Sequence, residues 1–258
     1  MDVITSEKSG HVLTFNEKTH RYYCDDKSIP GVTGTNKQGF PTSVMLIGWQ
    51  IGQGAKYAID EVKALIKGKK KLTQKVIKNI IKSSKTASLR VAQVSADIGT
   101  VVHDYVYCDA QKLPFDMSII DNHVDKEKIN KCLKSYYDWK ATVNDEVESA
   151  EQIVASVKHW YAGKYDRVAI RDGKRILQDF KTSSYFFIDQ FIQLSAYKMA
   201  IEEWLGLKID GLEVIRFGKD GSFDTKMIEA EKIPFYEEQF IRNLKTSQFR
   251  KTYEKDYK

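Results

Sequence analysis

The sequence predicts a single mixed α/β domain in which helices flank one small sheet. Two observations lead to this fold class. Apolar residues recur at helical spacing over most of residues 42–142, whereas residues 151–181 form the alternating and continuous apolar runs that are typical of strands. No internal repeat and no long linker interrupts the 258 residues, a length that gives one large domain a sizeable core.

The individual elements follow from local patterns in chain order. The runs HVLTF and HRYYC, joined by a polar turn, predict an N-terminal hairpin within residues 11–33. The predicted helices cover residues 42–67, 73–83, 87–110, 126–142, 189–206 and 234–249, and the predicted strands cover residues 151–181, 211–217 and 223–229. We expect one domain over 1–258 in three parts, which are an N-terminal hairpin with helices (1–86), a core (87–230) and a C-terminal helix with a basic tail (231–258).

The composition is that of an ordinary globular protein, with 42% hydrophobic and 29% charged residues. No apolar run approaches the roughly 20 residues that span a bilayer, and the first residues form neither a signal core nor a transit pattern. We therefore expect a cytoplasmic protein with no membrane partner. The net charge of +6 permits an anionic partner such as nucleic acid but does not establish one.

The three cysteines, Cys24, Cys108 and Cys132, lie far apart and form no CxxC pair. A structural zinc site or an iron–sulfur cluster needs about four ligands at close spacing. We expect free, mostly buried thiols and no iron–sulfur cluster.

The clearest local signal is Asp172-Gly173, which favours a two-residue type I′ turn between two strands. If that turn forms, Asp166 directly faces Asp179, with Cβ atoms about 5 Å apart. Strand alternation places Lys181 on the same face as Asp179. Facing carboxylates repel one another unless a positive charge lies between them, and Mg²⁺ takes its ligands from one or two carboxylates and water. The hairpin therefore predicts a metal site.

Two other interpretations of the hairpin stay open at this point. The acids could be solvated charges on an edge hairpin, with Lys181 and Arg167 as ion-pair partners. A slip of the register by one residue would instead place the two acids on opposite faces of the sheet.

Four motifs accompany the strand that ends in DFKT. They are Gly99-Thr100 with His103, Glu151 ahead of a strand, Gly163 with Asp166, and Gln193 with Tyr197. In this order the set resembles the PD-(D/E)XK nuclease superfamily, specifically its RecB-like branch, which includes phage and mitochondrial single-strand DNA exonucleases. The matches span residues 99–197. The N-terminal hairpin, followed by IPGVTGT and a helix with Trp49, is also similar to the amino-terminal portion of phage members.

The resemblance implies a restriction-endonuclease-like core and metal-dependent hydrolysis of DNA phosphodiester bonds. Asp166, Asp179 and the main-chain carbonyl of Phe180 would hold Mg²⁺ or Mn²⁺, which lowers the pKa of a bound water and polarises the phosphate. Lys181 would orient that water or stabilise charge in the transition state.

Further site residues have roles that the resemblance only suggests. His103 could ligate the metal or contact phosphate, although a lone helical histidine is also common as an ordinary core or surface residue. Glu151 would be an additional acidic ligand, with Glu148 as the alternative three residues earlier. Gln193 and Tyr197 share a helix face, which either faces the site, with Gln193 bonded to the lysine or to phosphate, or packs as an ordinary amphipathic helix.

Basic clusters could contact the phosphate backbone, or they could be solvated surface. They are Lys67–Lys71 and, near the C-terminus, Arg242, Lys245, Arg250 and Lys251. The 14 tyrosines and 4 tryptophans would suit stacking on a single strand, although most fit a core or its rim.

The function that we expect from these features is a metal-dependent DNA exonuclease, acting on single strands or duplex ends in replication, recombination or repair in a phage or a bacterium, where it could have a protein partner. One alternative is an endonuclease of the same superfamily for restriction or defence. Another is a non-catalytic DNA-binding or assembly module, which the intact set of two acids and a lysine disfavours.

Overall fold

The computed structural model describes residues 2–39 and 44–254, and its contacts divide the chain into two compact units. The larger unit comprises Met1–Phe40 and Val101–Lys258, and the smaller comprises Pro41–Thr100. The prediction of one domain over 1–258 stays a prediction.

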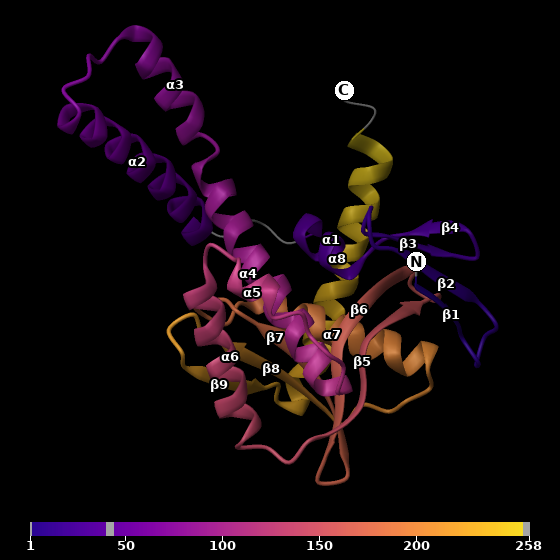
Figure 1. Cartoon of the computed structure of the whole chain (residues 1–258). Helices are drawn as coiled ribbons and strands as arrows, with labels where there is room; N and C mark the ends of the chain where they lie inside the picture. Colours follow the sequence, from indigo (N-terminus) through magenta and orange to yellow (C-terminus); the bar gives the residue numbers. More distant parts are fainter. Residues whose placement is uncertain (1, 40–43, 255–258) are drawn as a thin grey trace. The chain divides into compact units, whose positions relative to one another are not determined.

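A five-stranded sheet forms the centre of the larger unit (Figure 1). Its strands, in spatial order, are β5 (Glu146–Ser156), β6 (Tyr161–Arg171), β7 (Lys174–Lys181), β8 (Gly211–Phe217) and β9 (Phe223–Met227). Neighbouring strands are antiparallel except for β7 and β8, which are parallel. The sheet is therefore mixed, and the predicted fold class, a small mixed sheet flanked by helices, is confirmed.

A second, antiparallel sheet lies at the N-terminus of the chain. It comprises β1 (Asp2–Thr5), β2 (Val12–Asn16), β3 (Arg21–Cys24) and β4 (Lys27–Ile29). The pairing of β2 with β3 confirms the predicted hairpin. The two edge strands were not predicted, because each has only three or four residues and most of them are exposed.

Helices cover the five-stranded sheet. In the larger unit they are α1 (Val32–Gly39), α5 (Ser118–Asp121), α6 (Lys126–Lys140), α7 (Ile188–Trp204), the 3₁₀ helix η1 (Ala230–Lys232) and α8 (Ile233–Tyr253). Helix α7 contacts β5 through β8, and α6 contacts β8 and β9 (Figure 1). Trp139 of α6 packs against Phe180 of β7 and Phe217 of β8. Helix α8 packs on α1 and α7 instead, and the predicted helices at 126–142, 189–206 and 234–249 are confirmed.

Helix α1 was not predicted, because its sequence VTGTNKQG has two glycines and no apolar stripe. Tertiary bonds hold it instead. The Asn36 amide donates to the carbonyl of Asp189 and accepts from Asn243, a buried residue of α8. Local propensity is therefore overridden at this helix by contacts with residues more than 150 positions away.

The smaller unit is helical. It contains α2 (Val44–Lys67), α3 (Gln74–Ser84) and the first part of α4 (Ala87–Gln111), whose later residues belong to the larger unit. Thr73 caps α3 by accepting a hydrogen bond from the Val76 N–H. The predicted helices at 42–67, 73–83 and 87–110 are confirmed, except that the expected start at Thr42 lies outside the described residues.

Two further predictions bear on packing and location. Cys24 and Cys132 are buried and Cys108 is half-buried, all three as free thiols, as the sequence predicts. Within the described chain, no helix combines the length and the apolar character that crossing a membrane requires.

Candidate metal centre

The β6–β7 hairpin has the predicted register. Asp172 and Gly173 have φ angles of 50° and 73°, the positive values that a type I′ turn requires at both central positions. From this turn the ladder continues pair by pair to Arg167 and Gln178. The register that is slipped by one residue is therefore excluded.

The two acids lie at the position where the ladder ends. Beyond the Arg167–Gln178 pair, the backbone N–H of Phe180 donates to Oδ2 of Asp166, at 2.6 Å. The hairpin is also interior, because β5 and β8 flank it, and Asp179 is only 1% exposed. The interpretation as solvated charges on an edge hairpin is therefore wrong.

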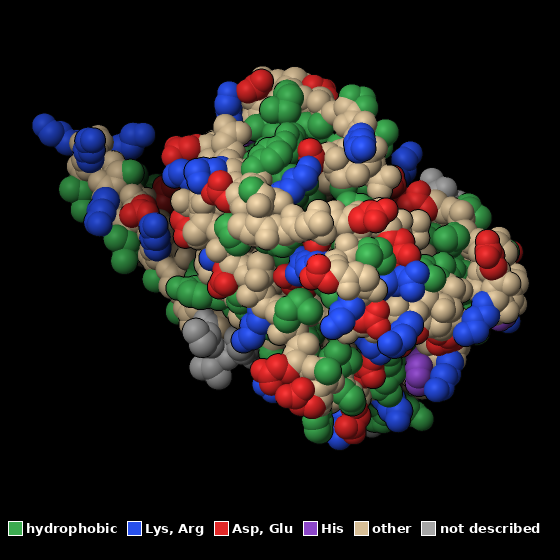
Figure 2. Space-filling model, turned by 90° about the horizontal axis from the view of Figure 1, so that it is seen from below, with side chains coloured by type: hydrophobic (Ala, Val, Ile, Leu, Met, Phe, Trp, Pro, Cys, Tyr) green, Lys and Arg blue, Asp and Glu red, His purple; other side chains and the backbone are tan. Residues whose placement is uncertain are grey.

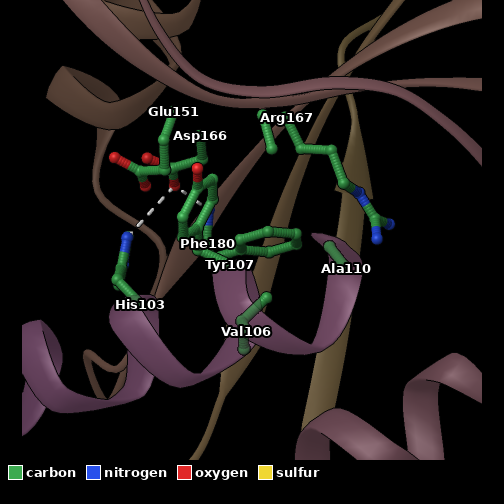
Figure 3. A pocket seen from close by; sticks show the side chains of 9 residues that line it. His103, Val106, Tyr107, Ala110, Glu151, Asp166, Arg167 and Phe180 are labelled. Atoms are coloured by element: carbon green, nitrogen blue, oxygen red, sulfur yellow. Dashed lines mark hydrogen bonds and ion pairs between the residues drawn. The ribbon is translucent and has the colours of Figure 1, made fainter. Parts of the chain in front are cut away.

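Three side chains from three separate elements converge beside the hairpin: His103 of α4, Glu151 of β5 and Asp166 of β6. One ligand atom from each lies within 4.8 Å of the others. Nδ1 of His103 is 3.6 Å from Oδ2 of Asp166. Figure 3 shows the imidazole pointing toward the two carboxylates, while the side chain of Arg167 points away from them.

The backbone of Glu151 is unusual for a strand residue. Its φ is 52°, in the left-handed region that a non-glycine residue rarely adopts, although Ala150 and Gln152 on either side keep regular ladder partners. Such a conformation costs on the order of 1 kcal/mol and is found preferentially at functional sites. The Glu151 carboxylate is also held from β6 by Lys164, at 2.8 Å.

Glu148, the alternative to Glu151, has a different partner. Its two carboxylate oxygens accept hydrogen bonds from the Arg175 guanidinium at 2.8–3.0 Å. The register of β5 against β6 shifts between Val147 and Ser149, so Glu148 occupies a β-bulge. The structure thus brings Glu151, and not Glu148, next to His103 and Asp166.

Asp179 and Lys181 form an ion pair at the end of β7. The lysine Nζ lies 2.7 Å from Oδ1 and 2.6 Å from Oδ2 of Asp179. Oδ2 is buried, and despite this proximity it receives no well-directed hydrogen bond. One oxygen of a buried acid thus keeps unused capacity to accept a donor or to bind a cation.

Burial raises the pKa of all three acids, and the charge of Asp166 adds to the shift at Asp179 and Glu151. Burial raises the pKa of Asp179 to about 6, against the opposing charge of Lys181 and with a further contribution from Asp166. The pKa of Asp166 is raised by burial, and that of Glu151 by burial and by the charge of Asp166. Ionised carboxylates are therefore disfavoured here unless positive charge is supplied.

The two basic groups of the site respond in opposite directions. Burial, and next the charge of Lys181, lower the pKa of His103, so its imidazole is neutral and can act as a ligand. Burial alone would lower the pKa of Lys181, but Asp179 and Asp166 outweigh it and raise that pKa. Lys181 is therefore a permanent cation.

Gln193 and Tyr197 of α7 are joined to each other and to the N-terminal part of the chain. The Gln193 amide donates to the Tyr197 hydroxyl at 2.8 Å and to Oγ1 of Thr33 at 3.1 Å, rather than to Lys181. A Cβ at Gly163 would lie 2.4 Å from the Tyr197 ring, so only glycine lets this ring pack on β6. The charges of Asp179 and Asp166 contribute to a raised pKa of Tyr197, which burial dominates.

Two residues of this arrangement, Lys164 and Thr33, were not predicted from the sequence. Lys164 was identifiable, because strand alternation places it on the same face of β6 as Asp166. Thr33 was not, since its contact with Gln193 spans 160 residues and depends on the unpredicted helix α1.

The donor set suits a divalent cation. Glu151 and Asp166 are half-buried and Asp179 is buried, all three have raised pKa values, and Mg²⁺ or Mn²⁺ would relieve their repulsion. An imidazole nitrogen is more typical of softer metals. His103 therefore fits either as one ligand among oxygen donors or as a contact to a bound phosphate. The adjoining pocket is small, with about 10 Å³ open, room for about one water or ion.

Comparison with known proteins adds little to this geometry. No family model and no curated protein sequence matches the chain. Structural matches include the protein SSO0001, at 14% identity and a TM-score of 0.27 over 56% of this chain and 73% of that one. They also include a protein from Eubacterium rectale named "Putative exonuclease", at 13% identity and a TM-score of 0.37 over 60% of this chain and 68% of that one. Likenesses this distant carry no functional assignment.

Proposed function

We propose that the protein is a metal-dependent nuclease of the PD-(D/E)XK superfamily that removes nucleotides from DNA ends. One observation carries the proposal. His103, Glu151 and Asp166, from three separate elements, bring ligand atoms within 4.8 Å of one another. The ion-paired Asp179 and Lys181 lie at the end of the strand next to β6. Acids with raised pKa values beside a lysine, in a site that is still partly exposed, favour a role in chemistry over one in packing.

We assign the metal ligands to Asp166 and Glu151, with Asp179, the main-chain carbonyl of Phe180 and His103 completing the candidate set. When bound, Mg²⁺ or Mn²⁺ would polarise the scissile phosphate and lower the pKa of a water. The protein's part is to hold the acids in place. The Phe180 N–H fixes the Asp166 carboxylate, and Lys164 fixes that of Glu151.

Lys181 is the residue that we assign to stabilising negative charge. Its ammonium stays protonated at physiological pH because two acids raise its pKa. A cation held at this position can orient a water or interact with phosphate oxygens as charge develops on them. Gln193 and Tyr197 have a positioning role in this proposal, because their hydrogen bonds tie α7 to α1 beside the acids.

The proposal is tested with linear single-stranded, linear duplex and covalently closed circular DNA, each in Mg²⁺, Mn²⁺ or EDTA. We expect cleavage of linear substrates only, dependent on the metal. Cutting of closed circles would replace the exonuclease by an endonuclease of restriction or defence. Inactivity on all substrates would favour a non-catalytic DNA-binding or assembly module.

The roles of the ion pair are tested by Asp179→Ala and Lys181→Ala. Both variants should lose cleavage while keeping the fold and most of the affinity for DNA. Cleavage at a near wild-type rate by either variant would show that the assigned site is wrong. A cytoplasmic location and work in replication, recombination or repair remain predictions from the sequence.

A further inference from the structure

The positive charge of the protein is concentrated in the smaller, helical unit. Residues 41–100 hold 11 Lys and Arg against 3 Asp and Glu, a formal charge of +8. The other 198 residues hold 30 basic and 32 acidic side chains, a formal charge of −2. The excess of +6 over the whole chain therefore comes entirely from this unit, and blue side chains gather on its helices at the left of Figure 2.

Within the unit, the charge forms one uninterrupted basic run. Residues 62–96 contain ten Lys and Arg and no Asp or Glu. Among the described residues, the ion pairs lie in the larger unit, and none joins a cation of this run to a carboxylate. Arg90 is held by Thr86 and lies over the Tyr57 ring, but the nine lysines are exposed. Within residues 2–39 and 44–254, no carboxylate forms an ion pair with these lysines.

The helix α3 arranges part of this run as a stripe. Lys75, Lys78, Lys82 and Lys85 are spaced by three and four residues, so their side chains follow one face of the helix and its C-terminal end. The loop before α3 adds Lys69–Lys71, also exposed. Seven cations along one helix face and its preceding loop match a ligand with regularly repeated negative charge.

The opposite face of α3 packs within the unit. Ile80 is buried, and α3 and α2 contact each other. A Cβ at Gly54 of α2 would lie 3.0 Å from the carbonyl oxygen of Ser84, so the two segments are close there. A helix that lies in a membrane surface must insert its apolar face. Ile80 on that face is covered, whereas Ile77 and Ile81 of α3 are exposed. The regular spacing of the lysines therefore carries the choice of a polyanion with repeated phosphates, and lipid vesicles serve as the competing ligand in the test.

We infer that the lysines of α3 and its preceding loop form a binding surface for the phosphodiester backbone of a nucleic acid. This inference rests on the proposed function, which supplies DNA as the ligand, but it assigns binding to a unit that contains none of the proposed metal ligands. Contacts of lysine with phosphate release condensed counterions, so the affinity should fall steeply with salt and be indifferent to base sequence.

The experiment compares two variants with the same change in charge. In the stripe variant Lys75, Lys78, Lys82 and Lys85 become Gln, which preserves helix propensity. In the control variant four exposed lysines of the larger unit become Gln, namely Lys18, Lys112, Lys158 and Lys174. Circular dichroism and thermal unfolding establish that both variants are folded. Binding of labelled single-stranded and duplex DNA is measured in EDTA over a range of salt, so that cleavage plays no part.

We expect the stripe variant to bind single strands more than about tenfold more weakly at low salt. Its slope of log affinity against log salt should be smaller by about 3, since each single-strand phosphate contact contributes about 0.7. The control variant should bind like the wild type. Equal affinity and slope in the two variants would overturn the inference, as would binding of the wild type to phosphatidylserine vesicles but not to DNA.

The same measurements separate this inference from the proposed function. Stripe-dependent binding of DNA without metal-dependent cleavage would refute the nuclease and leave the surface in place. Metal-dependent cleavage together with unchanged binding by the stripe variant would refute the binding surface and leave the nuclease in place.

Discussion

Two consecutive positions of the β6–β7 hairpin use polar residues in opposite ways. At the last ladder pair, Arg167 and Gln178 are bonded to each other at 2.7 Å. One position further from the turn, Asp166 and Asp179 carry like charges, and their pKa values are raised. The first pair belongs to a network in which each group has a partner, whereas the second retains repulsion.

The network around Arg167 is complete. We call it the buried network, and it consists of Asp145, Arg167, Arg171, Gln178 and Glu213. The Gln178 amide donates to both acids at 2.8 Å, while Arg167 and Arg171 bond to Asp145. Burial by itself would raise the pKa of Asp145, but hydrogen bonds from Arg171 and Gln178 lower it. Two cations and two anions thus balance.

The contrast separates polar groups that stabilise the fold, in the buried network, from the acids Asp166 and Asp179, whose charges the fold has to accommodate. The Arg167 guanidinium also lies over the rings of Trp139 and Phe180, at 4.9 and 5.2 Å, so the buried network contacts α6 as well as the hairpin. That anchoring holds Asp166 and Asp179 at positions where their charges are unfavourable. The predictions that follow test this division.

The largest expected effect concerns the acids of the candidate metal centre. Glu151→Gln keeps the shape of the side chain but removes a negative charge next to Asp166. We expect cleavage to fall by at least about 100-fold and the affinity for Mn²⁺ to fall with it. Single-turnover cleavage and Mn²⁺ electron paramagnetic resonance give the two readouts. Wild-type Mn²⁺ affinity in this variant would remove Glu151 from the ligand set.

A substitution in the buried network should lower the stability of the protein. Arg167→Met removes the cation that contacts Asp145 and Gln178. The Gln178 side-chain oxygen then loses its donor, and Arg171 is left as the one cation of the buried network facing Asp145 and Glu213. We expect the free energy of unfolding to fall by about 3–5 kcal/mol, as when one partner of a buried ion pair is removed. Urea denaturation measures this change. Arg167→Lys keeps the charge but loses the planar guanidinium, so its free energy of unfolding should lie between those of the wild type and Arg167→Met. A loss below about 1 kcal/mol in Arg167→Met would show that the network does not anchor the hairpin.

Much of this hairpin could be predicted from the sequence, because its chemistry is local. Asp172-Gly173 alone determines the turn, the turn determines the register, and the register brings Asp166 and Asp179 to the end of the ladder. The long helices were also predictable, since their apolar spacing is sustained over ten residues or more.

The choice between Glu148 and Glu151 could not be predicted from the sequence. Both lie on β5, three residues apart, and only the bulge between Val147 and Ser149 separates their surroundings. The left-handed backbone of Glu151 has no sequence signal either, because a glutamate gives no reason to expect it. In both cases the long-range pairing of β5 with β6 determines the outcome, and a local sequence pattern contains no information on that pairing.

Asp179 and Asp145, an acid of the buried network, should also make opposite contributions to the pH dependence of stability. The pKa of Asp179 in the folded protein is raised to about 6, above its unfolded value. Its contribution to stability is therefore present below pH 4 and is lost as the pH rises through 6. The pKa of Asp145 is lowered, so its contribution is present above pH 4 and is lost as the pH falls.

Unfolding of the metal-free protein between pH 4 and 8 tests this sign difference. Asp179→Asn should lose less stability than the wild type as the pH rises, and Mg²⁺ should reduce the loss in the wild type only. Asp145→Asn should be destabilised relative to the wild type throughout this range, and the difference should shrink when the series is extended below pH 4. If stability relative to the wild type changed with pH in the same direction in both variants, the distinction between the acids and the buried network would be contradicted.

The smallest expected effect belongs to Glu148→Gln, the matched partner of Glu151→Gln. Both substitutions remove one charge from the same strand without changing its size. Glu148 contacts Arg175 at a partly exposed position, where an ion pair contributes up to about 1 kcal/mol. We therefore expect a loss of stability below about 1 kcal/mol that diminishes further in high salt, with cleavage and Mn²⁺ affinity unchanged. If Glu148→Gln instead impaired cleavage as severely as Glu151→Gln, the acidic ligand of β5 would be at the bulge, and the strained backbone of Glu151 would have no part in the site.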